Sequence, residues 1–209
     1  VPANVNFILQ TTGYEKIIYV GHSQGTAQMF AALSDPITHE WANKVISNFV
    51  ALAPVCKMTN FREKIIKTLS EHKEIIEVTA KLLGKYQLVE NNCQIKPWKL
   101  ALYNLVCKEN AWFCDLKFAL SDQNPAYDNL PLTGRYLNTK PQGASLQGLV
   151  HLAQLITQKS PKFMMYDWGP YRNMKEYGRK DPPQYDLTKI KTKVSAYVGT
   201  GDLFASLPD

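Results

Sequence analysis

A serine flanked by two glycines, in the sequence Gly21-His22-Ser23-Gln24-Gly25, is the part of the chain best suited to chemistry. A serine on a sharp turn between a strand and a helix exposes its hydroxyl at the end of a sheet, where it can act as a nucleophile. Glycine is expected at Gly21 and Gly25 because the two backbones approach so closely there that a Cβ atom would clash. The pattern predicts a nucleophile elbow with Ser23 as the nucleophile.

An aspartate near the end of the chain is the candidate acid of a catalytic triad. The apolar run from Val194 to Val198 is followed by Gly199-Thr200-Gly201-Asp202, and in an α/β hydrolase the acid follows a strand downstream of the serine. Asp202 therefore fits that role, while a plain turn or cap residue is the alternative. Asp209 is a rival acid, although it lies further beyond the strand.

The chain offers no well-placed general base. Every histidine precedes Asp202, and although one adjoins Ser23, an elbow points neighbouring side chains in different directions. The others are expected in a loop or on helices of the insertion, and His151 suits a hydrogen-bonded structural role better than a catalytic one. The backbone N–H of Gln24 is the expected oxyanion-hole donor, at the positive end of the helix that starts there. The histidines are His22, His39, His72 and His151.

The elements around the elbow predict an α/β fold. A β-branched and aromatic strand is expected over 16–20, a helix of small and apolar residues over 25–33, and a second buried strand over 45–54. Two strands joined through a helix imply a parallel pair. A helix from Pro2 to Thr12 is expected before them, with Gly13 placed to end it.

Helical periodicity replaces the strand pattern in the middle of the chain. We therefore expect a partial α/β core over 1–54, a helical insertion over 55–188, and a return to the core over 189–209. A helix is expected over 145–158. An apolar stripe could contact a lipid interface, but burial inside the protein is its commoner use. The stripe comprises Ile65, Ile66, Leu69, His72, Ile75, Ile76, Leu82 and Leu83.

Composition excludes several classes of protein. The 209 residues carry a net charge of +6, and the lysines alternate with glutamates, so no nucleic-acid partner is expected. No apolar run reaches the roughly 18 residues of a membrane span. Four cysteines allow one or two disulfides, but their spacing matches no zinc site, and we expect neither a metal nor a cofactor. The cysteines are Cys56, Cys93, Cys107 and Cys114.

An ordered set of motifs along the whole chain resembles the acid lipase family, which includes gastric and lysosomal acid lipases. The family resemblance implies an α/β-hydrolase core, a helical cap with a movable lid, and hydrolysis of triacylglycerols or cholesteryl esters at a lipid–water interface. It also implies a secreted or lysosomal protein and suggests a Cys107–Cys114 bridge, with two buried thiols as the alternative and Cys56 as a buried free thiol. The motifs are Tyr19–Thr26, Ala51–Val55, Tyr166–Gly169, Pro182–Leu187 and Gly201–Leu203.

The family places its catalytic histidine after the acid, and its second oxyanion donor after an earlier strand. We therefore expect this chain, which runs from Val1 to Asp209, to be incomplete at both ends and inactive on its own. A general carboxylesterase and a catalytically inactive lipid-binding or storage protein of the same fold are the alternative functions. A histidine in the segment after Asp209 of the parent protein would favour the enzyme.

Overall fold

The computed structural model describes residues 1–89, 105 and 144–209, which fall into two compact units. The first unit joins Val1–Phe61 to Leu155–Asp209, and the second spans Arg62–Gln154. These units divide the chain at 61/62 and 154/155, and the domain boundaries that the sequence indicates, at 54/55 and 188/189, stay a prediction. Residues 90–104 and 106–143 of the expected insertion, with Cys93, Cys107 and Cys114 among them, lie outside the described residues.

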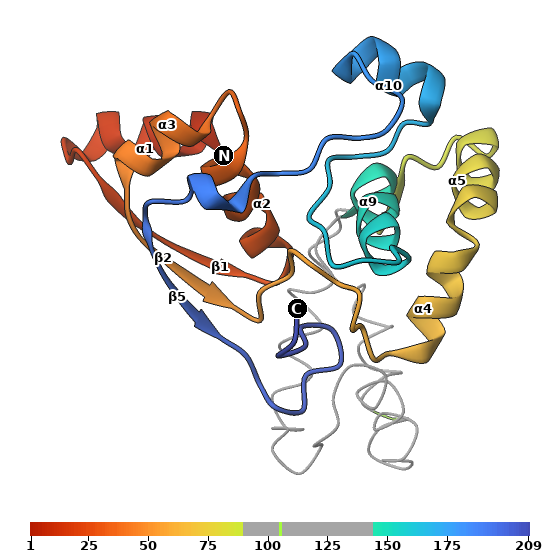
Figure 1. The fold of residues 1–209 in the computed structure, drawn as a ribbon. Coiled ribbons are helices and arrows are strands. Elements are labelled where there is room, and N and C mark those ends of the chain that lie inside the picture. The colour runs from red at the N-terminus through yellow and green to blue at the C-terminus, as the bar shows by residue number, and fades with distance from the viewer. Residues whose placement is uncertain (90–104, 106–143) are drawn as a thin grey trace. The chain divides into compact units, whose positions relative to one another are not determined.

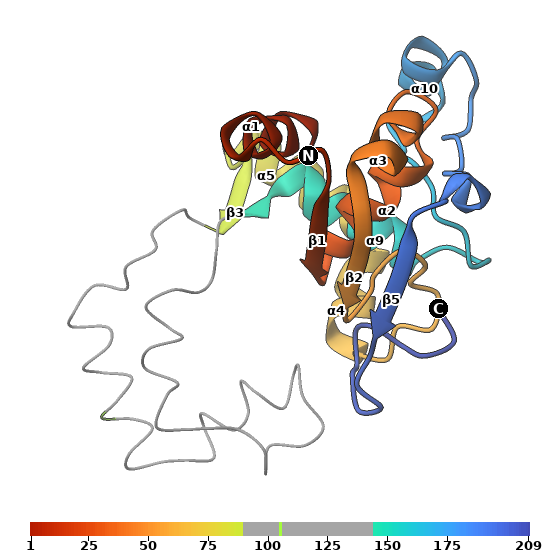
Figure 2. The same cartoon turned by 90° about the vertical axis from the view of Figure 1, so that its left-hand side faces the viewer.

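A parallel three-stranded sheet forms the centre of the first unit, with strand order β1-β2-β5 (Figures 1 and 2). Strands β1 (Ile17–His22) and β5 (Lys193–Tyr197) both pair with β2 (Ile46–Leu52). The register aligns His22 with Leu52, and Leu52 with Tyr197, at the carboxyl ends of the three strands. The predicted α/β class is therefore confirmed, and the loops after all three strands leave from one edge of the sheet.

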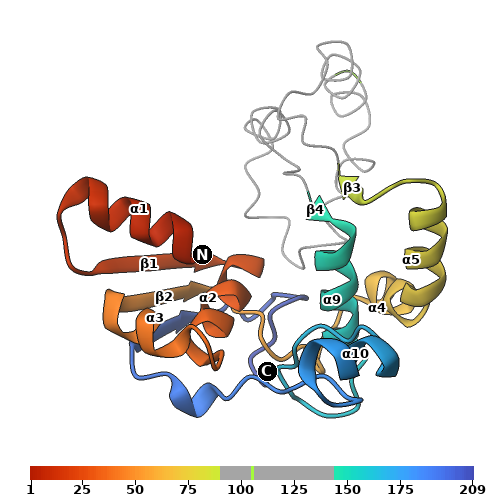
Figure 3. The same ribbon diagram turned by 90° about the horizontal axis from the view of Figure 1, so that it is seen from above.

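Helices α1, α2 and α3 of the first unit all lie in the part of the chain before β2. Helix α1 (Pro2–Thr12) ends at Gly13, which adopts φ 74° as predicted, and α2 (Gln24–Ser34) follows the elbow. Helix α3 (His39–Val45) was not predicted, and the expectation that His39 lies in a loop is wrong. The Asp35 carboxylate accepts hydrogen bonds from the N–H groups of Ile37 and Thr38 and so holds the turn that precedes this short helix. Viewed from above, α2 and α3 lie over β2 and β5 (Figure 3).

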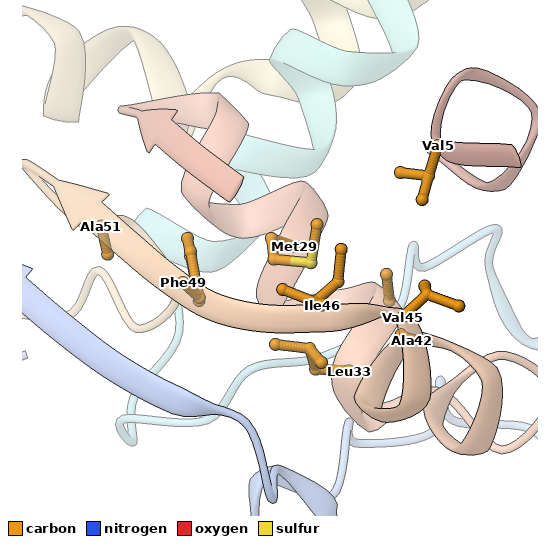
Figure 4. Close-up of a cluster of buried hydrophobic side chains, with 9 residues drawn as sticks. Val5, Met29, Leu33, Ala42, Val45, Ile46, Phe49 and Ala51 are labelled. Carbon is orange, nitrogen blue, oxygen red and sulfur yellow. The ribbon is translucent and has the colours of Figure 1, made fainter. Parts of the chain in front are cut away.

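The core of this unit is one apolar cluster that joins the helices to β2 (Figure 4). Phe49 of β2 is fully buried and lies edge-on to Tyr19 of β1 and Phe30 of α2, with ring centroids 5.7 and 4.9 Å away. Such edge-to-face pairs add to the stabilisation from buried area. The strand that leads to the elbow is thus packed on the helix that follows it. The buried members are Val5, Met29, Ala32, Leu33, Ala42, Val45, Ile46, Phe49 and Ala51.

The second unit contains helices α4 (Lys64–Glu71) and α5 (Lys73–Leu82), and a small pair of strands, β3 (Gln87–Val89) and β4 (Ala144–Ser145) (Figure 3). Glu63 caps α4, because its carboxylate accepts hydrogen bonds from the N–H groups of Ile65 and Ile66. Burial of the apolar stripe is wrong for several residues: Ile65, Leu69, Ile75, Leu82 and Leu83 are exposed. Helix α9 (Leu146–Ile156) lies within the predicted range.

The Tyr166–Gly169 motif is held by buried Asn173 of α10 (Pro170–Tyr177). The Asn173 amide donates to Asp167 Oδ1 at 2.6 Å and accepts from the Trp168 N–H at 2.9 Å. Arg172 lies 3.6 Å from the centre of the Trp168 ring, a cation–π contact. These contacts give the motif a structural role in the first unit. Among the described residues, no helix combines the length and apolar character needed to cross a membrane.

Asn43 of α3 fixes the chain as it enters β5, after the short helix η3 (Leu187–Lys189). Its Nδ2 donates to the His39 and Lys189 carbonyls at 2.7 and 3.1 Å. Its Oδ1 accepts from the N–H groups of Lys191 and Thr192 at 2.7 and 3.0 Å. One side chain therefore satisfies backbone groups on both sides of the entry to the third strand.

We expect Asn43→Ala to lower the free energy of unfolding by about 2–3 kcal/mol, because several partly buried backbone groups would lose their partner together. Lys44→Ala, at the next and exposed position of the same helix, is the matched control and should change it by less than about 0.5 kcal/mol. Urea-induced unfolding measures both. Equal stability of the two variants would contradict this account of Asn43.

Candidate active site

Ser23 occupies a strained turn between β1 and α2. Its backbone has φ 51° and ψ −120°, and among the described residues only Ser23 and Ala53 are non-glycine residues with positive φ. Such a conformation costs of order 1–3 kcal/mol and persists only where its surroundings enforce it. Ser23 is the N-cap residue of α2, yet its hydroxyl makes no capping hydrogen bond. A serine at this position ordinarily caps the helix, so here the hydroxyl is left available.

Hydrogen bonds from both sides hold the turn in place. The Ser23 N–H donates to the Leu52 carbonyl at the end of β2 at 3.0 Å. The Ser23 carbonyl accepts from the Thr26 hydroxyl at 2.6 Å and from the Thr26 N–H at 2.8 Å. The same Thr26 hydroxyl, which is fully buried, accepts from the Val55 N–H at 2.9 Å. The elbow is thus bonded to the exit of the neighbouring strand.

The two glycines of the turn do not share one explanation. A Cβ atom on Gly21 would lie 2.9 Å from Tyr19 Cε1 and 3.0 Å from the carbonyl carbon and oxygen of Gly25, so the predicted clash exists there. A Cβ atom on Gly25 would meet only the Tyr19 hydroxyl at 3.7 Å, an ordinary contact, so the clash expected at Gly25 is wrong. A side chain at Gly25 would therefore point to a side where there is room for a Cβ atom.

A hydrogen bond from the Tyr19 side chain also stabilises the turn. Its hydroxyl donates to the Gly25 carbonyl at 3.0 Å, and burial raises the pKa of this phenol above its ordinary value. The hydroxyl therefore stays protonated and remains a donor at any physiological pH. Sequence analysis did not assign Tyr19 or Thr26 this role. Their contacts depend on where Gly25 and Val55 come to lie, and no local pattern encodes that.

Gln24 is the first residue of α2, so its N–H has no acceptor within the helix. Among the described residues, no hydrogen bond from this N–H to another group is present. A free N–H next to a serine hydroxyl, at the positive end of a helix of 11 residues, suits the stabilisation of a developing oxyanion. His22, on the other side of Ser23, is exposed at the end of β1.

Asp202 lies in the loop after β5. Its Oδ1 accepts hydrogen bonds from the N–H groups of Phe204 and Ala205 at 2.8 and 2.9 Å, which orients the carboxylate. Within the described part of the chain, its other oxygen has no hydrogen-bond partner and could receive an N–H from an imidazole. The rival acid differs: both oxygens of Asp209 accept hydrogen bonds from Thr59, Asn60 and Ser206.

The topology brings Ser23 and Asp202 to the same edge of the sheet, because β1 and β5 both run parallel to β2 and their following loops leave at the carboxyl ends. Ligand sites of open α/β sheets lie at this edge. In the part of the chain that the structure describes, no histidine is hydrogen-bonded to either residue. His39 Nδ1 is instead 3.0 Å from the Asp35 carbonyl, and His72 and His151 belong to the second unit.

The remaining sequence-predicted residues give no further site. Burial raises the pKa of the Cys56 thiol, so this half-buried free cysteine stays protonated at neutral pH. The proposed Cys107–Cys114 bridge falls on residues outside the description. Among the described residues, no group of three or more histidine, cysteine, aspartate or glutamate side chains could hold a metal ion.

We expect Gly21→Ala to destabilise the protein by about 1–3 kcal/mol, because its Cβ would press on the backbone of Gly25, which cannot move without displacing the turn. Gly25→Ala is the matched variant, and thermal unfolding should show it within about 1 kcal/mol of the original protein, since alanine is also the better helix former. A loss of the same size in both variants would contradict the asymmetry of the turn.

We expect Thr26→Val to cost about 2–3 kcal/mol of unfolding free energy, because the Val55 N–H would stay buried without its acceptor and the Ser23 carbonyl would lose a donor. Thr26→Ser keeps the hydroxyl and should recover most of that stability. Chemical denaturation of the two variants separates the lost hydrogen bonds from the lost methyl group. A Ser variant as unstable as the Val variant would show that packing dominates.

Comparisons with known proteins agree with this geometry. Residues 1–88 match the alpha/beta hydrolase fold family. The whole chain is 34% identical to gastric triacylglycerol lipase of Rattus norvegicus and 32% identical to lipase member K of Homo sapiens, and it covers 51% and 50% of those proteins. Over 99% of its length it is 31% identical to lipase lipl-5 of Caenorhabditis elegans, of which it covers 51%. The chain therefore spans about half the length of the curated relatives it matches, and its parallel sheet and strand-turn-helix motif fit the alpha/beta hydrolase fold that residues 1–88 match.

Proposed function

We propose that the full-length protein hydrolyses carboxylic esters of neutral lipids through an acyl-enzyme on Ser23. The Ser23 hydroxyl oxygen attacks the ester carbonyl carbon, and the base takes its proton. The carbonyl oxygen becomes an oxyanion next to the Gln24 N–H, and it re-forms the carbonyl as the alcohol leaves with the proton. Water, deprotonated by the same base, then releases the fatty acid from Ser23. Asp202 orients the base and stabilises its cationic form.

The observation that carries this proposal is the unused hydroxyl of Ser23 at a strained position. The residue has a positive φ that glycine would adopt more readily, and it forgoes the capping bond that serine usually makes. Both features weaken the folded state locally. A nucleophile held ready for a substrate explains them, whereas an ordinary turn residue does not.

We infer that the general base comes from a part of the full-length protein other than these 209 residues. The four histidines of the chain are described, and none of them is hydrogen-bonded to Ser23 or Asp202. The relatives are about twice as long as the chain, so a base from elsewhere in the protein is compatible with the similarity. The unpartnered oxygen of Asp202 is the group we expect to receive its N–H.

The substrate class rests on the relatives, four of which are named as gastric triacylglycerol lipases. We propose triacylglycerols or cholesteryl esters as substrates, met at a lipid–water interface, and a secreted or lysosomal location. The sheet and the elbow alone would serve a general carboxylesterase equally well, since neither encodes the length of the acyl chain. The choice between ester classes therefore has to come from the assay.

We expect two substitutions of Ser23 in the full-length protein to abolish ester hydrolysis and labelling by a fluorophosphonate probe, but to differ in stability. Ser23→Ala keeps the strained backbone, whereas Ser23→Gly relaxes it and should be more stable than Ser23→Ala by about 1 kcal/mol. Activity, labelling and thermal unfolding are measured on the same preparations. Hydrolysis by either variant at the original rate would exclude Ser23 as the nucleophile.

The same assay separates the proposed substrate class from its alternatives. Emulsions of triolein and cholesteryl oleate are compared with the short, soluble ester p-nitrophenyl acetate. Ser23-dependent turnover of an emulsion supports the neutral-lipid hydrolase, and turnover of the soluble ester alone supports a general carboxylesterase. Binding of the emulsion without any Ser23-dependent turnover would identify an inactive lipid-binding protein.

A further inference from the structure

The loop that carries Asp202 is fastened to the segment that follows β2. Phe204 lies edge-on to Phe61, with ring centroids 5.2 Å apart and an interplanar angle of 85°. Ala205 and Ser206, which come next, are buried. Within the loop, Asp202 Oδ1 accepts hydrogen bonds from the backbone N–H groups of Phe204 and Ala205. Phe204, one of the two residues that orient the Asp202 carboxylate, is therefore itself packed against the segment after β2.

Asp209 provides the second attachment, through polar contacts. Its Oδ1 accepts from the Thr59 hydroxyl at 3.1 Å and from the Asn60 amide at 2.9 Å. Its Oδ2 accepts from the Asn60 N–H at 3.1 Å and from the Ser206 hydroxyl at 3.0 Å. A carboxylate is the strongest acceptor available to such donors, and four of them fix both of its oxygens. Asp209 thus joins the end of the Asp202 loop to Thr59 and Asn60.

The same segment contacts the elbow at its other end. The Leu52 carbonyl accepts the Ser23 N–H at 3.0 Å, and the Val55 N–H donates to the Thr26 hydroxyl at 2.9 Å. Ala53, with φ 48°, donates its N–H to the Tyr197 carbonyl at the end of β5 at 2.8 Å. The stretch over 52–61, which we name the connecting segment, therefore touches the serine turn at one end and the Asp202 loop at the other.

We propose that Asp209 is a positioning residue that fixes Asp202 relative to Ser23 through the connecting segment. The inference rests on the proposed function, because it assigns Asp209 a part in the triad's geometry. Asp202 lies beyond the end of β5, an edge strand that pairs only with β2 in the described sheet, so the strand alone leaves the loop's path open. Asp209 and Phe204 fix the loop to the far end of the connecting segment, at residues 59–61, while the near end of that segment is bonded to the elbow.

The test measures ester hydrolysis by the full-length protein. The concentration of reactive Ser23 is titrated with a fluorophosphonate, and the rate is divided by it, so that a loss of folded protein is not read as a lower kcat. Asp209→Ala should lower kcat about ten- to a hundredfold with KM nearly unchanged, since a small misplacement of a triad member slows the chemical step. Asp209→Asn retains one acceptor oxygen and should lose less. Asp186→Ala is the matched control, because its exposed carboxylate likewise accepts a backbone N–H and a hydroxyl, those of Thr188, and it should leave kcat unchanged.

The decisive comparison uses an Asp202→Asn background. If Asp209 acts through Asp202, adding Asp209→Ala should slow that variant by no more than about twofold, because coupled residues are not additive. If Asp209→Ala lowers the kcat of the Asp202→Asn variant as much as it lowers that of the original protein, the proposal is overturned. It is also overturned if Asp209→Ala keeps the original kcat while Asp202→Asn is impaired. An original rate in Asp202→Asn itself would instead overturn the assignment of Asp202 and with it the proposed function of this site.

Discussion

The buried hydroxyl of Thr26 is the interaction on which the arrangement around Ser23 depends. It donates to the Ser23 carbonyl and accepts from the Val55 N–H, so one oxygen connects the turn, the first turn of α2 and the chain leaving β2. The Ser23 N–H bonds to Leu52 on the same neighbouring strand. A strained residue needs partners on both sides, because a turn anchored on one side would relax. These bonds supply them.

The packing of the core makes those bonds possible. Phe49 of β2 contacts aromatic rings from β1 and α2, and this fixes the strand and the helix that Ser23 joins at the separation the turn requires. Tyr19 takes part in both layers, because its ring packs on Phe49 while its hydroxyl reaches the Gly25 carbonyl. The apolar core and the polar turn are therefore one structure, and a change in either would move Ser23.

Local patterns in the sequence predicted the three strands of the parallel sheet, the elbow helix and the end of α1 at Gly13, because short-range rules of alternation, helix capping and glycine conformation govern them; the short pair β3 and β4 was not predicted. Helix α3 escaped prediction, since at seven residues it is too short to show periodicity and its N-cap residue Thr38 makes no side-chain capping bond. The clash expected at Gly25 was wrong because it depends on the path of the backbone after the turn. The bonds of Thr26 and Asp209 join residues far apart in sequence, and no spacing rule reveals such partners.

Ser23 bears two local costs that a residue with no further role would avoid. A positive φ is unfavourable for any residue with a Cβ atom, and a serine at the N-cap that makes no capping bond gives up about 1 kcal/mol. The surrounding bonds offset these costs but do not explain why serine occupies the position, since they involve only its backbone N–H and carbonyl. The side chain is the one part of the residue that the fold does not use. An oxygen presented in this way, beside the free N–H of Gln24 and at the sheet edge that also carries Asp202, is accounted for by chemistry on a substrate.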